Sequence, residues 1–316
     1  MKPFAFVFPG QGSQAVGMLD AWGDHPVVAE TVREASDALS QDLGELIRSG
    51  PKEALALTTN TQPVMLVAGV AAYRVWMDRT GVVPNVVAGH SLGEYAALVA
   101  AGVMTLQQAA PLVRLRAQAM QDAVPVGTGS MAAVLGLDPA RVVAICAQVQ
   151  AELAEDSAAV VEAANFNDPG QTVISGSKAA VERACELLKS GGARRAMLLP
   201  VSAPFHCRLM LPAAEKLRVA LESVMFEAPS MALINNVDVA VEVDADRIRD
   251  ALYRQAFGAV RWVECVQALK ARGVTDVVEC GPGKVLTGMV ARIDPELTGL
   301  PLFDPATLDA AVAALD

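Results

Sequence analysis

Ser91 lies in a segment whose residue types could present a nucleophile. An apolar run, Val86-Val87-Ala88, is typical of a buried strand, and Gly89-His90-Ser91-Leu92-Gly93 follows it directly. A Gly-x-Ser-x-Gly turn between a strand and a helix is the pattern of a nucleophile elbow, because glycines let the two elements approach while the hydroxyl points outward. The small and apolar residues that continue to Leu98 have a helical pattern. We therefore expect an activated serine, with a backbone amide and a helix N-terminus facing an oxygen that becomes negative.

A serine hydroxyl needs a base within hydrogen-bond reach, and the chain has only 3 histidines. His25 lies in a polar connection and is typical of an exposed surface residue. His90 precedes the nucleophile, and we expect its side chain to point away and to have a structural role. His206 lies in a loop between an expected strand and a helix, where α/β proteins place catalytic groups. The sequence therefore predicts His206 as the base that activates Ser91.

Common α/β serine hydrolases place an acidic residue between the serine and the histidine in chain order. Asp168 lies in that interval, but within Asn167-Asp168-Pro169-Gly170, where its side chain suits a turn. We therefore expect a dyad rather than a triad, with the imidazole oriented by a backbone carbonyl or an amide. Gln255 is the candidate support.

Arg116 is a candidate ligand for an acid. It lies in an expected helix, 106–120, that would pack beside the elbow helix in an otherwise apolar sequence. A buried guanidinium without an anion is costly, and a carboxylate matches it with two parallel hydrogen bonds. A substrate with a free carboxylate would supply the partner. The spacing alone leaves a solvated arginine open as the alternative.

Composition excludes several classes of function. Lys and Arg number 25 against 35 Asp and Glu, giving a net charge of −10, which argues against nucleic acid as a partner. The 5 cysteines are odd in number and contain no C-x-x-C pair, so reduced thiols are expected rather than disulfides or a zinc site. No apolar stretch is long enough to cross a bilayer, and the N-terminus begins a strand rather than a signal peptide. We expect a cytoplasmic monomer that needs no membrane, metal or cofactor.

The alternation of strands and helices predicts an α/β protein with a mostly parallel, covered sheet. Residues 124–130 interrupt this alternation, and a βαββαβ order follows, which is the ferredoxin-like arrangement. We therefore expect a core formed by 1–126 and 201–316, with 127–200 inserted as a small subdomain. Within the core, a strand is expected over 82–88 and a helix over 61–77, and the last helix is expected to begin at Lys284.

The sequence resembles the malonyl-CoA:acyl carrier protein transacylases. The resemblance extends in order over nearly the whole chain, through Phe8-Pro9-Gly10-Gln11-Gly12-Ser13-Gln14, Gln62-Pro63, Gly89-His90-Ser91-Leu92-Gly93-Glu94, Arg116 with Met120-Gln121, Asn165-Phe166-Asn167 with Pro169-Gly170-Gln171, Pro204-Phe205-His206, Asn235-Asn236, Arg254-Gln255 and Gly281-Pro282-Gly283-Lys284. One departure is Gly258-Ala259, where the family often has Asn-Pro. This departure puts the turn in doubt but not the chemistry.

The resemblance implies a role for each matching residue. Ser91 would be the acylated nucleophile and His206 its general base and acid. The backbone amides of Gln11 and Leu92 would form the oxyanion hole. Arg116 would hold the malonyl carboxylate, and the region of Gln255 would orient the histidine. The implied architecture is a hydrolase-like α/β core with a ferredoxin-like small subdomain, in agreement with the order of elements.

The function expected from this resemblance is ping-pong transfer of malonyl from malonyl-CoA to the phosphopantetheine thiol of acyl carrier protein, for fatty-acid synthesis. The partners would be that carrier and coenzyme A thioesters, and Arg194 with Arg195 could form a basic rim for an acidic carrier. Three alternatives stay open: an acyltransferase serving polyketide assembly, a thioester hydrolase with the same Ser-His dyad, and a non-catalytic module that binds the carrier.

Overall fold

The computed structural model describes residues 1–155 and 158–316. Its elements follow one another as β1 (Phe4–Phe8), η1 (Asp20–Trp22), α1 (Pro26–Leu39), α2 (Leu43–Ser49), α3 (Lys52–Ala56), α4 (Thr58–Thr80), β2 (Val86–Gly89), α5 (Gly93–Ala100), α6 (Leu106–Asp122), β3 (Gly129–Leu135), α7 (Pro139–Glu152), β4 (Val161–Asp168), β5 (Gln171–Ser177), α8 (Lys178–Ser190), β6 (Arg195–Leu198), η2 (Arg208–Met210), α9 (Leu211–Glu222), β7 (Ala232–Ile234), α10 (Ala245–Gln255), α11 (Trp262–Ala271), β8 (Asp276–Cys280), α12 (Val285–Ile293), β9 (Thr298–Leu302) and α13 (Pro305–Leu315).

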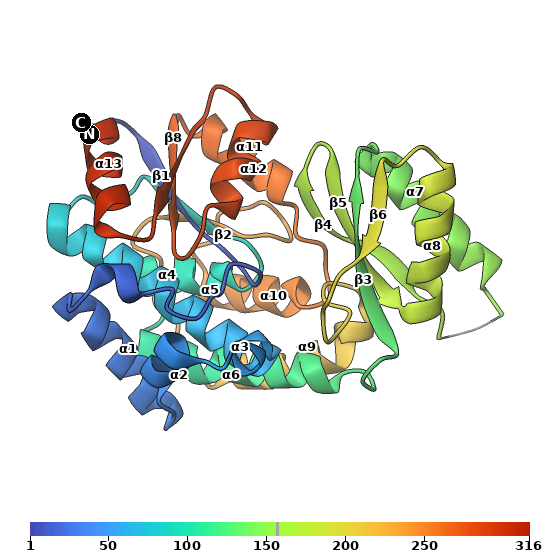
Figure 1. Ribbon diagram of the computed structural model, residues 1–316, viewed down its shortest axis with the longest axis horizontal. Coiled ribbons are helices and arrows are strands. Elements are labelled where there is room, and N and C mark those ends of the chain that lie inside the picture. Colours follow the sequence, from blue (N-terminus) through green and yellow to red (C-terminus); the bar gives the residue numbers. More distant parts are fainter. Residues whose placement is uncertain (156–157) are drawn as a thin grey trace.

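The larger sheet is parallel, with strand order β7-β2-β1-β8-β9. Alternate side chains of the central strand β1 face opposite sides of the sheet. Phe4, Phe6 and Phe8 pack with the helices α4, α5 and α6, whereas Ala5 and Val7 pack with α11 and α12. Figure 1 shows these two helical layers on either side of β1, β2 and β8. The predicted α/β core with a covered parallel sheet is confirmed.

The smaller sheet is antiparallel, with strand order β4-β5-β3-β6. The helices α7 and α8 cover its outer face, on the right of Figure 1, and this unit has the βαββαβ order predicted from the sequence. Its other face carries Met131, Ala164 and Val173, which pack against Val201 and Phe205 of the segment that returns to the core. The division at 127 and 200 stays a prediction, and the strands of this sheet lie between residues 129 and 198.

Two expected elements have different bounds. The strand expected from residue 82 begins only at Val86, because Pro84 lacks an N–H and the carbonyl of Val82 accepts a hydrogen bond from the Trp76 indole at 2.8 Å. The helix expected over 61–77 is α4, which starts at Thr58 and contains Pro63 as its sixth residue. Pro63 has no N–H to donate to the Thr59 carbonyl four residues earlier, so α4 continues through it without this one intrahelical hydrogen bond.

The expectation that the last helix begins at Lys284 is wrong. After α12, the strand β9 joins the edge of the larger sheet and α13 packs beside it. Pro301 within β9 masks the strand pattern, and a proline is compatible with an edge strand. The helix α13 does carry a recognisable start, since Asp304 and Thr307 form a capping box and Pro305 follows the cap.

Three further features are the state of the cysteines, the length of the helices and the distribution of metal-ligating side chains. All 5 cysteines are free and buried. Among the helices in the described ranges, none combines the length and the apolar character needed to span a bilayer. No group of three or more metal-ligating side chains is gathered in the part of the chain that the structure describes.

Candidate active site

The turn from β2 into α5 presents Ser91 as an elbow. A Cβ placed on Gly89 would lie 2.0 Å from the carbonyl carbon of Gly93, and one on Gly93 would lie 2.0 Å from the carbonyl oxygen of Phe8. Only glycine fits at either position, because these contacts are with backbone that cannot move aside. Ser91 itself has φ 53°, a left-handed conformation that non-glycine residues rarely adopt. The local sequence therefore forces the sharp turn, and the hydroxyl lies at its apex.

His206 lies against this hydroxyl, as the sequence predicted. Its Nε2 is 2.6 Å from Ser91 Oγ, and its Nδ1 is 2.9 Å from the carbonyl oxygen of Gln255 and 3.2 Å from that of Gly258. Because carbonyls only accept, Nδ1 carries the proton and Nε2 is free to accept one from the serine. Burial, with a further contribution from the positive charge of Arg116, lowers the pKa of His206 to about 3. The imidazole is therefore neutral at ordinary pH, as a general base must be.

The imidazole has no carboxylate partner among the described residues, which agrees with the expected dyad. Asp168 is occupied elsewhere: its Oδ1 accepts from the Gly170 amide at 2.9 Å and its Oδ2 accepts from Arg292 at 2.7 Å. The Gly258 carbonyl contributes to orienting His206 even though the sequence departs from the family pattern there. A backbone oxygen performs this task, so the side chain at that position is not decisive.

Arg116 also reaches the nucleophile. Its Nη2 lies 3.2 Å from Ser91 Oγ and 3.0 Å from Gln255 Oε1, and its Nη1 lies 2.7 Å from Gln62 Oε1. The side chain is only 1 % exposed, and Nε has no partner among the described atoms. None of the ion pairs found in the described ranges includes it. A buried guanidinium held by neutral amides retains its attraction for an incoming carboxylate.

Gln255 connects several of these groups. Its Oε1 accepts from Arg116, its Nε2 donates to the Ser91 carbonyl at 2.9 Å and to Glu94 Oε2 at 3.1 Å, and its backbone carbonyl accepts from His206. Glu94 is 2 % exposed, and burial raises its pKa to about 7. The predicted support of the imidazole therefore comes from the backbone carbonyl of Gln255. The Gln255 side chain instead hydrogen-bonds Arg116 and the backbone of Ser91.

The two amides expected to form the oxyanion hole come from different turns of the core. Gln11 lies in the loop after β1 and lines the cavity, and Leu92 is the residue that precedes α5. Within 1–155 and 158–316 neither backbone N–H donates to another group, so both are available to an oxyanion. Their role stays a prediction.

Ser91, His206 and Arg116 line a cavity of about 330 Å³ between the two sheets. Its polar wall is formed by Ser91, His206, Arg116, Asn165 and Asn167, and its apolar wall by Met131, Val173, Phe205, Leu286 and Met289. Asn167 Oδ1 accepts from His90 Nε2 at 2.8 Å, and His90 also lines the cavity, so its structural role stays a prediction. The cavity combines a nucleophile, a neutral base and a cation with an apolar channel, as acyl transfer from an acidic thioester requires.

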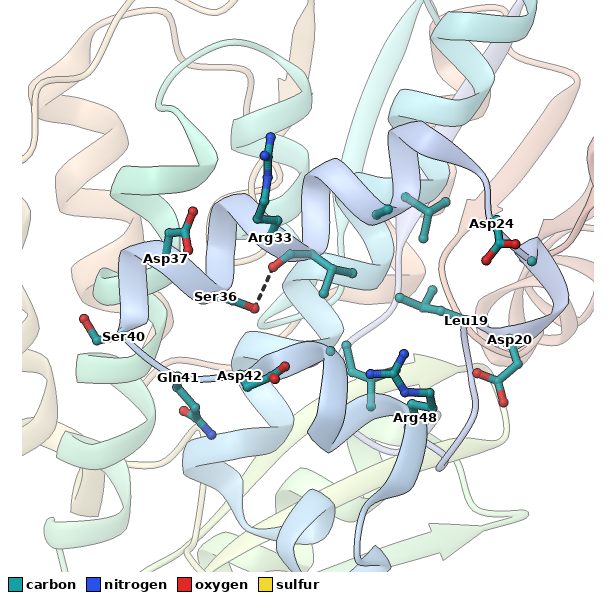
Figure 2. Close-up of a pocket in the computed structure, with 16 residues that line it drawn as sticks. Leu19, Asp20, Asp24, Arg33, Ser36, Asp37, Ser40, Gln41, Asp42 and Arg48 are labelled. Carbon is teal, nitrogen blue, oxygen red and sulfur yellow. Dashed lines mark hydrogen bonds between the residues drawn. The ribbon is translucent and has the colours of Figure 1, made fainter.

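A larger hollow of about 830 Å³ lies elsewhere, against α1 and α2 (Figure 2). Asp20, Asp24, Asp37 and Asp42 line it together with two arginines, and its described lining includes neither histidine nor cysteine. The Ser36 hydroxyl donates to the Val32 carbonyl of its own helix at 2.7 Å. The hollow thus lacks a nucleophile with a base, and size alone does not make it the reaction site.

Three residues near the nucleophile received no role from the sequence. Gln62 and Asn236 occur in the motifs of the resemblance, and Glu94 follows the elbow, but nothing in their spacing indicates that they meet Ser91, Arg116 or Gln255.

Arg194 and Arg195 are exposed, and Arg194 borders a separate hollow with Asp168 and Arg292. Their proposed contact with a carrier stays a prediction.

Comparison with known proteins gives consistent matches. A family model described as an acyl transferase domain matches residues 5–293. The malonyl CoA-acyl carrier protein transacylase of Escherichia coli (strain K12) is 52% identical over 313 residues, which are 99% of each chain. The crystal structure of acyl-carrier-protein S-malonyltransferase from Burkholderia pseudomallei 1710b is 60% identical, with a TM-score of 0.95 over 99% of this chain and 100% of that one. A malonyl-transacylase in complex with its holo type II PKS acyl-carrier protein is 48% identical, with a TM-score of 0.95 over 99% and 100% of the two chains.

Proposed function

The chain belongs to the acyl transferase domain family, and from this premise we propose that it transfers malonyl from malonyl-CoA to the phosphopantetheine thiol of acyl carrier protein. The malonyl group passes through an ester on Ser91 and supplies units for fatty-acid synthesis. The observation that carries the proposal is that His206 Nε2 at 2.6 Å and Arg116 Nη2 at 3.2 Å both meet Ser91 Oγ. One group activates the hydroxyl, and the other selects a substrate that carries a carboxylate.

In the first half-reaction, Ser91 Oγ gives its proton to His206 Nε2 and attacks the thioester carbonyl carbon. The amides of Gln11 and Leu92 stabilise the resulting oxyanion. The carbon–sulfur bond then breaks, and the leaving thiolate takes the proton from Nε2. Free coenzyme A and the malonyl ester of Ser91 are the products, and no proton is gained or lost overall.

In the second half-reaction, the thiol of the carrier's phosphopantetheine enters where coenzyme A left. His206 Nε2 accepts the thiol proton, and the sulfur attacks the ester carbonyl. The bond to Ser91 Oγ breaks, and the oxygen recovers its proton from the imidazole. The low pKa of His206 suits both steps, because the imidazolium returns its proton readily.

A second candidate differs only in the carrier. One of the similar structures is a malonyl-transacylase bound to a type II PKS acyl-carrier protein, and it is 48% identical to this chain over nearly its full length. The residues at the nucleophile act on the malonyl group and on the phosphopantetheine thiol, which both kinds of carrier present, so they serve either acceptor. Transfer rates to carriers of the two kinds would distinguish them.

Intact-mass analysis after mixing with malonyl-, methylmalonyl- and acetyl-CoA tests the proposal. We expect one malonyl adduct per chain, absent in Ser91→Ala, and its loss when a carrier with a free thiol is added. In Arg116→Ala the adduct from malonyl-CoA should form more slowly, while the rate with acetyl-CoA relative to malonyl-CoA should rise, because the carboxylate has lost its partner.

Three results would contradict the proposal. Rapid release of malonate without any thiol acceptor would indicate a thioester hydrolase. An Arg116→Ala variant with an unchanged preference for malonyl-CoA would remove the arginine from its assigned role. A chain that forms no adduct at all would fit the non-catalytic alternative.

A further inference from the structure

The side chain of Asn236 reaches the elbow from the loop after β7. The strand β7 pairs with β2 as far as Ile234 beside Ala88, and there the two backbones separate. Asn236 is fully buried just beyond this point. Its Oδ1 accepts from the Ser91 amide at 2.7 Å, and its Nδ2 donates to the Gly89 carbonyl at 2.6 Å. The carboxamide therefore takes the place of one more peptide group of the parallel ladder.

The hydrogen bond from the Ser91 amide to Asn236 involves a residue whose backbone is in the left-handed conformation. Such a conformation persists only where surrounding contacts hold it. Asn236 hydrogen-bonds the N–H of Ser91 at 2.7 Å, and Gln255 Nε2 hydrogen-bonds its carbonyl at 2.9 Å. Both backbone polar groups of the nucleophile are thus fixed by side chains, while the Leu92 amide stays available.

A single carboxylate oxygen connects the backbone of Asn236 with the side chain of Gln255. Glu94 Oε2 accepts from the backbone N–H of Asn236 at 2.9 Å and from Gln255 Nε2 at 3.1 Å. The backbone carbonyl of Gln255 also accepts from His206 Nδ1 at 2.9 Å. The nucleophile and the base are therefore held by the same buried network, although they are 115 residues apart in the chain.

We propose that Asn236, held by Glu94, is a positioning residue that fixes the Ser91 hydroxyl against His206 in both half-reactions. The inference rests on the proposed function only for the identity of the acyl group. Neither Asn236 nor Glu94 lines the substrate cavity. A change at either residue should therefore alter the rate of acylation and leave substrate binding intact.

Asn236→Asp tests this with a side chain of the same shape. One carboxylate oxygen can still accept from the Ser91 amide, but the other faces the Gly89 carbonyl without a proton to donate. We expect the single-turnover rate of malonyl adduct formation to fall roughly tenfold to a hundredfold. The malonyl-CoA concentration that gives half the maximal rate should not change.

Acid should restore the variant, because a protonated aspartate donates to Gly89 and accepts from Ser91 as asparagine does. Burial and the neighbouring carboxylates of Glu94 and Asp238 raise the pKa of the introduced group, whereas Arg261 opposes them and the Cys265 thiol is neutral. The ratio of variant to wild-type rate should therefore rise as the pH is lowered from about 8 to about 6. The introduced carboxyl and Glu94 titrate as a coupled pair, so this ratio reports protonation of the pair rather than of either group alone.

Asn235→Asp is the matched control. Asn235 is 4 % exposed in the same loop, its Oδ1 accepts from the Asp238 amide at 2.8 Å, and its Nδ2 has no partner among the described atoms. The substitution adds the same buried charge without contact to the elbow. We expect a similar loss of thermal stability in both variants, with slow acylation only in Asn236→Asp.

A wild-type acylation rate in Asn236→Asp, or equal slowing in both variants, would overturn the inference. Asn236→Ala covers the case in which Asn236→Asp does not fold, since it removes the carboxamide that meets Ser91 and Gly89 and introduces no buried charge. It should also slow acylation, and a wild-type rate there would equally refute the network. Labelling of Ser91 by a fluorophosphonate separates this inference from the proposed function. If wild type reacts with that probe and not with malonyl-CoA, the function fails, while slower labelling of Asn236→Asp still supports the positioning role.

Discussion

At the scale of single residues, His206 and Glu94 are buried groups whose pKa values lie far from their ordinary range. Burial lowers the pKa of His206 to about 3 and raises that of Glu94 to about 7. The two shifts have opposite effects on stability. The His206 pKa is lower in the folded chain than in the unfolded one, so its contribution weakens as the pH falls from 6.5 toward about 3. The contribution of Glu94 is full at low pH and is lost as the pH rises from 4.5 through about 7.

The first prediction concerns the protonation state of His206. Its ring resonances should not titrate between about pH 5 and pH 8, because the imidazole stays neutral throughout that range. NMR of histidine-labelled protein measures this directly, and His206→Asn assigns the signal by its disappearance. A midpoint near 6.5 for that resonance would show that the ring is solvated. It would then contradict the lowered pKa that keeps His206 neutral as a base.

Among the elements, the close crossing of β1, β2 and α5 makes the elbow possible. The helix begins at Gly93, close enough to the end of β1 that a Cβ there would lie 2.0 Å from the Phe8 carbonyl oxygen. This approach directs the helix N-terminus and the Leu92 amide toward the Ser91 hydroxyl. Rigid elements rather than a flexible loop therefore position the nucleophile.

The second prediction is that Gly93→Ala lowers the free energy of unfolding by more than about 2 kcal/mol, because strand and helix must separate to admit the methyl group. Gly288→Ala in α12 is the matched control, since its added Cβ meets only Arg292 Nη1, at an ordinary contact distance of 3.4 Å. That change should raise stability by up to about 1 kcal/mol through helix propensity. Denaturant unfolding of both variants measures the difference, and effects of equal sign would contradict the assignment.

In the whole molecule, the two sheets are joined directly beside the cavity. The backbone of β4 hydrogen-bonds to Val260 of the core, with Phe166 N donating at 2.9 Å and Ala164 O accepting at 2.8 Å. The Asn167 side chain meets His90, and Asp168 pairs with Arg292. These contacts and the apolar cluster around Phe205 bind the small sheet to the core. The cavity walls from the two sheets are thereby fixed relative to each other.

The third prediction is that the small sheet and the core unfold together. Cys146 and Cys185 are buried under the small sheet, whereas Cys265 and Cys280 are buried in the core. Thiol labelling at increasing denaturant, read by peptide mass, should give one midpoint for all four, as expected for a cooperative transition. Labelling of the first two at lower denaturant would show that 127–200 unfolds as an independent subdomain.

The sequence alone determined the elements whose signals are local. The glycines of the elbow, the alternation of strands and helices, and the βαββαβ order all depend on neighbouring residues. With only 3 histidines, the base could be identified by elimination. The sequence did not predict the edge strand β9, because Pro301 interrupts its strand pattern and the strand forms by pairing with β8.

Only the tertiary structure decided which groups meet around Ser91. It showed that two backbone carbonyls orient His206, that Gln62 and Gln255 hold Arg116, and that Asn236 completes the ladder beside the nucleophile. These contacts join α4, the elbow, α6, the loop of His206, the loop after β7, α10 and the turn that follows α10. Their physical reason is the packing of the parallel sheet, which brings the ends of β1, β2 and β7 to one edge and leaves buried polar groups that can be satisfied only by each other. The spacing of these residues along the chain does not indicate that the strand ends bring them together.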